Sequence, residues 1–207
     1  MFDAHAHIGI PTDRAIVCSS SPEEWPMMAD YRYRFIGLLP GNMPIDISEM
    51  ADRASRFYGI GEVGIDRRYP GIEDQVSFLK AALSLSKELR VPAVLHIVGF
   101  YEEALKAIRE TGNRYFMVHG FTGSYEIASR IMDLGGLISL GPRAERCKAF
   151  SRLITLPFVT ETDMKTGPGQ KAALSAWNEK LSLLTGRDIE SESGKAIQSF
   201  LCRKSSS

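Results

Sequence analysis

A regular alternation of short apolar runs with stretches of helical periodicity constrains this sequence more than any other feature. There are eight such runs, and each is too short to be a typical helix. Their nearly continuous apolarity is typical of parallel strands buried on both faces. Parallel strands alternating with helices predict an α/β fold, a barrel of the TIM (β/α)8 type. The runs span residues 2–8, 15–19, 35–39, 59–65, 93–98, 115–121, 137–140 and 158–162.

The segments between the runs have the spacing of amphipathic helices. The clearest helix is predicted over residues 72–90. Similar spacing predicts helices over residues 100–110 and 124–134. Ser21 followed by Pro22 indicates a further helix start. In the segment 72–90, apolar residues recur at i, i+4, i+7 and i+11 on one face. They are Ile72, Val76, Leu79 and Leu83.

The first connection is too short for a normal parallel crossover. About half a dozen residues separate the first two runs, whereas such a crossover needs about a dozen or more. We therefore expect a small barrel that lacks its first helix, in keeping with a length of 207 residues. We expect one domain over residues 1–200 and a disordered tail over 201–207.

Composition excludes several classes of protein. Lys and Arg total 25, as do Asp and Glu, so no net charge draws the chain to nucleic acid or an anionic membrane. No apolar stretch is long enough to span a membrane, and the start does not resemble a signal peptide. The cysteines are few and widely spaced, which favours a reducing compartment. We therefore expect a cytoplasmic protein with no membrane partner; oligomeric state stays open.

All four histidines lie in or at the end of predicted strands. His5 and His7 are two residues apart on an extended segment, so both side chains point to one face. His96 and His119 lie towards the ends of the fifth and sixth runs. A single histidine at a strand end is more often structural. Because every histidine is used in this way and imidazole binds divalent transition metals well, the set predicts a metal site.

Carboxylates occupy matching positions. Glu62 lies in a glycine-rich apolar strand, where burial is costly unless the charge has a partner. A metal supplies that partner, although a salt bridge would also do so. Asp163 ends the eighth run, where the alternative role is a turn or a helix cap. By alternation Glu161 shares the face of Asp163, and Asp3 shares that of the first two histidines, so either could orient a ligand.

Five motifs occur in an order that resembles a known family. They are FDAHAH at the start, GEVGID at 61–66, VLH at 94–96, VHGFTG at 118–123 and ETD at 161–163. Together they closely resemble the TatD-type deoxyribonucleases, metal-dependent hydrolases of the amidohydrolase superfamily. The resemblance implies two divalent ions, with Zn²⁺, Mn²⁺ and Mg²⁺ all open. It implies that one ion is bound by His5, His7 and Asp163, the other by His96 and His119, with Glu62 bridging.

The resemblance also implies hydrolysis of an ester by a metal-activated water, with Glu62 and Asp163 as catalytic residues and Asp163 as proton acceptor. Two divalent ions against two carboxylates leave about +2 at the site, which suits an anionic, phosphorylated substrate such as a DNA end. Arg67, Arg68 and Arg143 follow predicted strands and could grip a phosphate, or could be ordinary surface charges.

The substrate side departs from the family pattern. Leu39 stands where the family usually has a histidine before proline, and Val98 stands where an arginine is common. The segment after Asp163 is also different and short. Three hypotheses therefore remain: a phosphoester hydrolase, including a DNA 3′-end nuclease; a hydrolase of a carboxylic ester, lactone or amide; and an inactive metal-binding barrel.

Overall fold

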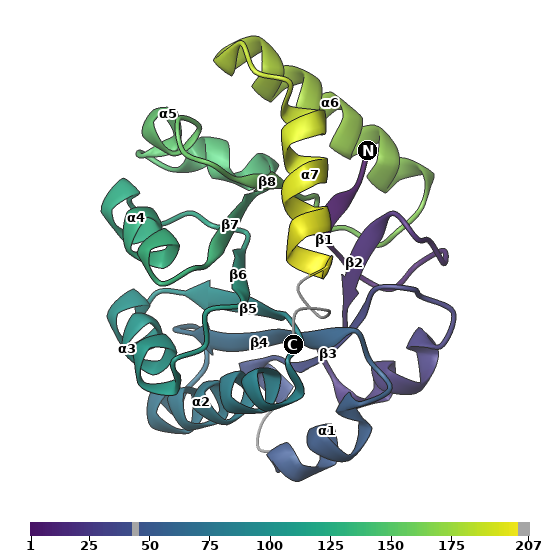
Figure 1. Ribbon diagram of the computed structural model, residues 1–207, viewed down its shortest axis with the longest axis vertical. Coiled ribbons are helices and arrows are strands. Elements are labelled where there is room, and N and C mark those ends of the chain that lie inside the picture. The colour runs from purple at the N-terminus through teal and green to yellow at the C-terminus, as the bar shows by residue number, and fades with distance from the viewer. Residues whose placement is uncertain (43–45, 203–207) are drawn as a thin grey trace.

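The computed structural model describes residues 1–42 and 46–202, and its centre is a sheet of eight parallel strands that follow one another in chain order. Each predicted run overlaps one strand, so the predicted barrel is confirmed. Figure 1 shows the strands as a ring with helices outside it. They are β1 (Asp3–Ala6), β2 (Ala15–Cys18), β3 (Arg34–Leu38), β4 (Gly59–Asp66), β5 (Ala93–Val98), β6 (Phe116–His119), β7 (Leu137–Leu140) and β8 (Val159–Thr160).

The ring closes between its last and first strands through irregular backbone hydrogen bonds. The amide of Asp163 donates to the carbonyl of His5 over 3.2 Å, and the amide of His7 donates to Met164 over 2.9 Å. The carbonyl of His7 then accepts the amide of Thr166 over 3.0 Å. Three candidate metal ligands therefore lie on the seam that completes the barrel.

The outer layer is uneven. Residues 7–14, between β1 and β2, contain no helix, as the short connection predicted. The next crossover holds only the 3₁₀ helix η1 (Pro22–Met28), with Pro22 at its start and no capping bond from Ser21. No described helix is both long and apolar enough to cross a lipid bilayer. The remaining helices are η2 (Pro40–Asn42), α1 (Ile47–Ala54), α2 (Ile72–Leu89), α3 (Tyr101–Thr111), α4 (Tyr125–Asp133), η3 (Pro142–Arg146), α5 (Phe150–Leu153), α6 (Pro168–Thr185) and α7 (Ile189–Cys202).

The three helices predicted from periodicity form within one residue of the expected bounds. In α2, Leu79 and Leu83 are fully buried, while Ile72 and Val76 pack at the edge of the same core. Ser124 caps α4 by accepting the amide of Ile127 over 3.2 Å. Because these helices place one apolar stripe against the strands, their positions follow directly from sequence spacing.

A second, smaller core fills the interior of the barrel and is closed by α7. Phe35, Val94 and Met117 point inward from the strands and pack with Ile197 and Phe200 of α7. Figure 1 shows α7 lying across the ring. The helix continues to Cys202 and buries Leu201, so these two residues belong to the helix and not to the expected tail. Residues 203–207 lie outside the described part of the chain.

Glycines let neighbouring strands approach closely beneath the site. A Cβ atom on Gly64 would lie 1.7 Å from the carbonyl oxygen of His96 on β5. A Cβ atom on Gly37 would lie 2.3 Å from the backbone of Glu62 on β4. Larger residues at these positions would separate the strands that carry two of the candidate ligands.

Candidate metal centre

Five different strands deliver the six predicted ligands to one mouth of the barrel. His5 lies in β1 and His7 directly follows it. Glu62 lies in β4, while His96 and His119 pair in register on β5 and β6. Asp163 follows β8. Because parallel strands all end at the same side of a barrel, side chains more than 150 residues apart meet there.

One group of side chains forms around Asp163. Its Oδ1 atom lies 3.0 Å from Nε2 of His7 and 3.6 Å from Nε2 of His5. Ligands bound to a zinc ion at about 2.1 Å lie about 3–4 Å from one another, so these spacings suit a shared cation. The three residues form a compact set of potential metal-binding atoms.

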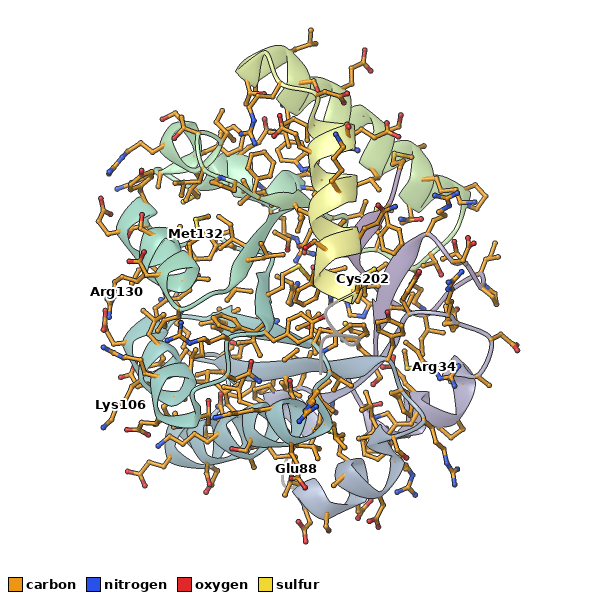
Figure 2. All side chains as sticks on the ribbon, viewed as in Figure 1. Arg34, Glu88, Lys106, Arg130, Met132 and Cys202 are labelled. Atoms are coloured by element: carbon orange, nitrogen blue, oxygen red, sulfur yellow. The ribbon has the colours of Figure 1, made fainter. Side chains whose placement is uncertain are left out.

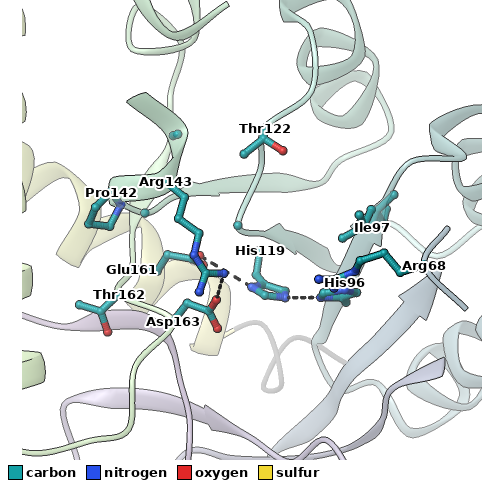
Figure 3. A pocket seen from close by; sticks show the side chains of 14 residues that line it. Arg68, His96, Ile97, His119, Thr122, Pro142, Arg143, Glu161, Thr162 and Asp163 are labelled. Carbon is teal, nitrogen blue, oxygen red and sulfur yellow. Dashed lines mark hydrogen bonds and ion pairs between the residues drawn. The ribbon is translucent and has the colours of Figure 1, made fainter. Parts of the chain in front are cut away.

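A second group forms around His119. Its Nε2 atom lies 3.1 Å from Nδ1 of His96 and 2.9 Å from Oε2 of Glu62. Nδ1 of His96 is 3.3 Å from the same carboxylate oxygen. Figure 3 shows His96 and His119 side by side, with this contact between their rings.

Glu62 lies between the two groups with one oxygen towards each. Oε2 faces His96 and His119, whereas Oε1 lies 3.6 Å from His7 and 3.8 Å from His5. This is the arrangement in which one carboxylate can contact two ions.

Several buried polar atoms of the site have no hydrogen-bond partner among the described residues. They are both ring nitrogens of His5, Oε1 of Glu62 and Nδ1 of His119. Burying such atoms without a partner costs about 1–3 kcal/mol each. Since Nε2 of His5 lies 3.8 Å from Oε1 of Glu62, the donor set fits divalent cations, which would supply partners for these two atoms.

The buried carboxylates and histidines of the site shift one another's pKa values. Burial opposes protonation of His119, but Glu62 and Glu161 outweigh it and hold the pKa of His119 well above its usual value. Burial likewise opposes ionisation of Glu62, yet the neighbouring histidines hold its pKa well below the usual range. His5 differs, because burial and the adjacent His119 lower its pKa.

The structure adds one residue that sequence reasoning missed. Asp66 is buried, and its Oδ2 lies 3.1 Å from Nε2 of His96. Arg68 donates to both oxygens of Asp66, with Nε at 2.9 Å from each. Burial would raise the pKa of Asp66, but hydrogen bonds from Arg68 hold it well below its usual value. The missed signal was spacing: Asp66 is four residues after Glu62, on the same face of the strand.

The two carboxylates expected to orient ligands have different surroundings. Glu161 is buried with Oε1 3.7 Å from Nδ1 of His119, and it also accepts a hydrogen bond from Ser139. Strand alternation does not explain its position relative to Asp163, because β8 ends at Thr160 and Asp163 has a left-handed φ of 56°.

The role expected for Asp3 differs in the structure. Its carboxylate accepts the amide of His5 and the amide and hydroxyl of Thr162, at 3.2, 3.1 and 2.6 Å, and Gln170 at 2.5 Å. It contacts no imidazole among the described residues. Period-two alternation placed Asp3 on the face of the histidines, but the register of β1 shifts between Asp3 and Ala6, and its carboxylate joins β1 to the segment after β8 and to α6 instead.

The mouth contains a cavity of about 180 Å³ lined by His96, His119 and Asp163. Arg68 and Arg143 also line it, and Nη1 of Arg143 donates to Oδ2 of Asp163 over 2.8 Å. Arg67 does not line this cavity; its side chain lies against Gly99. Figure 3 shows Arg68 and Arg143 on opposite sides of the histidines.

Fold and site together place the chain among the parallel (β/α)8 barrels whose mouth is built as a candidate metal centre. Comparison with known proteins identifies the family. Residues 33–190 match the family described as TatD related DNase, which is well over half of the 207 residues. The chain therefore belongs to the TatD-related DNase family.

Curated relatives match part of their length. "Uncharacterized metal-dependent hydrolase YjjV" of Escherichia coli is 29% identical over 153 residues, covering 66% of this chain and 59% of the relative. A protein of Methanocaldococcus jannaschii with the same general description is 32% identical over 108 residues, covering 50% of this chain and 43% of the relative. The chain thus spans about half the length of these relatives.

Solved structures support the fold independently. The crystal structure of E. coli YjjV, described as a TatD homolog, superposes with a TM-score of 0.80 at 20% identity, covering 98% of this chain and 96% of that one. A TatD-like protein of Archaeoglobus fulgidus gives a TM-score of 0.65 at 16% identity, covering 97% and 99%. At these identities the similarity shows the barrel alone.

Proposed function

We propose that this protein is a metal-dependent hydrolase that cleaves a phosphoester with water. The observation that carries the proposal is the position of Glu62, whose two oxygens face two separate groups of histidines. One group, with His5, His7 and Asp163, would hold one divalent ion; His96 and His119 would hold the other. Ions at these positions would acidify a water molecule and neutralise charge on the oxygen under attack.

Charge in the cavity favours an anionic substrate. Two guanidinium groups line the cavity: that of Arg143, which contacts Asp163 through Nη1 alone, and that of Arg68, whose Nε and Nη2 already donate to Asp66. A guanidinium binds phosphate through two parallel N–H groups and is less suited to a neutral ester. The family description as a DNase agrees with a phosphodiester substrate.

Asp163 is the candidate proton acceptor. Burial would raise the pKa of this carboxylate, but His5 and His7 hold it well below its usual value. Asp163 lines the cavity, where its Oδ2 also accepts a hydrogen bond from Arg143. A substrate phosphate drawn to Arg143 would therefore lie next to the group that accepts the proton from water.

The substrate can be a DNA 3′ end or a smaller phosphorylated compound. The cavity of about 180 Å³ accommodates one phosphoryl group with a small attached moiety. The loop after Asp163 packs against the segment between β1 and β2, where the backbone amide of Ile10 donates to the carbonyl of Thr166 over 2.9 Å. Because this loop is short, it offers little surface for contacts with a long DNA duplex. The experiment below therefore includes both DNA ends and small phosphorylated compounds.

The same site could hydrolyse a carboxylic ester, lactone or amide, whose carbonyl oxygen the ions would polarise. A barrel that binds metal without catalysis is a third hypothesis. The side chains of His7, His96 and Asp163 are 26%, 15% and 19% exposed, so three of the six candidate ligands are reached by solvent while His5, Glu62 and His119 are buried. An accessible mouth supports catalysis over an inert site.

Turnover of a substrate panel tests the proposal. The panel contains DNA with free 3′ ends, small phosphomonoesters and phosphodiesters, and acyl esters and lactones, each with Mg²⁺, Mn²⁺ or Zn²⁺. We expect metal-dependent turnover of a phosphoester, lost at least a hundredfold in Glu62→Gln and Asp163→Asn. Glu88→Gln, on the outer surface of α2 (Figure 2), is the charge-matched control. Turnover of acyl substrates alone would select the second hypothesis.

A further inference from the structure

The outer wall of the barrel has a second cavity, which no catalytic residue lines. It lies between η1 and α1 and has a volume of about 380 Å³, larger than the cavity at the mouth. It exists because η1 is a short 3₁₀ helix with Pro26 inside it, so no full α-helix fills this part of the outer layer. We call it the arginine groove, after Arg34, Arg53 and Arg56 in its lining.

The charges of the arginine groove are not balanced within the protein. Besides the three arginines, the lining holds one carboxylate, that of Glu49. In the described part of the chain, no carboxylate forms an ion pair with Arg34, Arg53 or Arg56. Glu49 and Arg53 are four apart on α1, yet Nη1 of Arg53 donates to the backbone carbonyl of Glu49, over 2.9 Å. The groove therefore carries an excess of about two positive charges.

Two of the guanidinium groups are held in place before any ligand binds. Nε of Arg34 donates to the carbonyl of Arg56 over 3.0 Å, and its Nη1 donates to Ala29 and Tyr31 over 2.8 and 3.2 Å. The same group lies 5.8 Å from the ring centre of Phe57. Figure 2 labels Arg34 beside the ribbon of η1.

Arg53 is fixed by an aromatic ring. Its guanidinium lies 5.5 Å from the centre of the Trp25 ring, and Nε1 of Trp25 donates to the carbonyl of Gly37 over 3.0 Å. The ring is therefore anchored to β3 while Arg53 rests on it. Stacking engages only the face of the guanidinium, so the N–H groups of Arg53 other than the one donated to Glu49 can bind a ligand.

We propose that the arginine groove binds a small phosphorylated molecule, a phosphate monoester or a diphosphate. Three guanidiniums against one carboxylate match a ligand with two or more negative charges. The volume is within the range of about 300–1,000 Å³ typical of small-molecule sites. Arg34 is the first residue of β3, so this site lies towards the opposite end of the barrel from the mouth. It does not depend on the proposed hydrolysis.

Trp25 offers a local signal for binding. The chain has two tryptophans, and Trp177 lies on α6, where its Nε1 donates to Leu140 over 2.8 Å. We would titrate inorganic pyrophosphate into full-length protein treated with a chelator and follow both indole N–H resonances by NMR. Trp177→Phe assigns the two signals. We expect a saturable shift of the Trp25 resonance and none of the Trp177 resonance.

Variants separate this site from general attraction of anions. Arg53→Gln with Arg56→Gln should weaken pyrophosphate binding at least tenfold, whereas Lys106→Gln with Arg109→Gln on α3 removes the same charge and should leave it unchanged. Glu49→Gln removes the carboxylate of the groove and should tighten pyrophosphate binding. This variant tests the proposal even if the double variant is unstable. No saturable shift, equal binding by the two double variants, or equal affinity for succinate would overturn the proposal.

Discussion

Asp66 holds His96 from the neighbouring strand, with 3.1 Å between the carboxylate Oδ2 and the ring Nε2. Because an ionised carboxylate can only accept, Nε2 of His96 carries the proton and donates. The other nitrogen, Nδ1, then turns its lone pair towards Glu62 and His119. Asp66 therefore selects the tautomer of His96 that can bind a cation.

Replacing Asp66 tests this relationship. In Asp66→Asn the carboxylate charge is lost and the amide no longer fixes the ring, so we expect metal affinity to fall about 10–100-fold. Isothermal titration of chelator-treated protein with Zn²⁺ or Mn²⁺ measures the change. Asp74→Asn, an exposed position on α2, is the matched control. Equal affinities in the two variants would show that His96 does not need Asp66.

Metal binding should also stabilise the fold. A ligand present at about 100 times its dissociation constant adds about 2.7 kcal/mol when it binds only the folded state. We expect thermal unfolding of the wild type to move to higher temperature when Zn²⁺ or Mn²⁺ replaces a chelator. In Glu62→Gln the shift should shrink by more than half. A full shift in that variant would mean that the ions bind elsewhere.

The pH dependence of stability should report on Asp3. Burial raises the pKa of Asp3 to about 7, although Thr162 and Gln170 donate hydrogen bonds to it. A carboxyl group with a raised pKa takes up a proton on folding, so its stabilising effect is full below about pH 4 and is lost as the pH rises through 7.

The variant Asp3→Asn removes this titration. In chelator, the wild type should lose stability relative to Asp3→Asn between pH 4.5 and pH 7.5, by up to about 1.4 kcal/mol per pH unit. Urea unfolding at both pH values measures the difference. A constant difference across this range would show that Asp3 stays ionised and that its hydrogen bonds outweigh burial.

The closing helix α7 provides a test of the inner core. Phe200 is 4% exposed and packs with the inward side chains of the strands. Phe200→Ala should lower the free energy of unfolding by about 3–5 kcal/mol, as for other buried aromatic residues. Leu183→Ala, at a position that is 81% exposed on α6, should change it by less than about 0.5 kcal/mol. Similar values for both would show that α7 does not close the barrel.

Much of the fold could be predicted because it depends on the pattern of neighbouring residues in the sequence. This holds for the strands, for three helices and for the positions of the six candidate ligands. A histidine at the end of a buried strand points to the mouth wherever the neighbouring strands fall. Spacing from Glu62 places Asp66 on the mouth side of β4, but its contact with His96 could not be predicted, because that contact depends on the register between β4 and β5. The contacts of Asp3 could not be predicted for the same reason. The groups that donate hydrogen bonds to its carboxylate belong to Thr162 and Gln170, which are distant in the sequence.

Helix α7 was missed for a different reason. Its apolar residues, among them Ile197 and Phe200, fill the end of a ring that exists only once all eight strands have assembled. The segment also looks polar in sequence, with Glu190 and Glu192 in its first turn. Tertiary packing, rather than local propensity, gives this segment its place.

We propose that six side chains hold two divalent ions: those of His5, His7, Glu62, His96, His119 and Asp163. Anomalous diffraction from crystals grown with Zn²⁺ or Mn²⁺ tests it most directly. We expect two anomalous peaks, one on each side of Glu62: one next to His7 and Asp163 and the other next to His96 and His119. An anomalous map with no peak among these six side chains, at a metal concentration that saturates binding in solution, would contradict it.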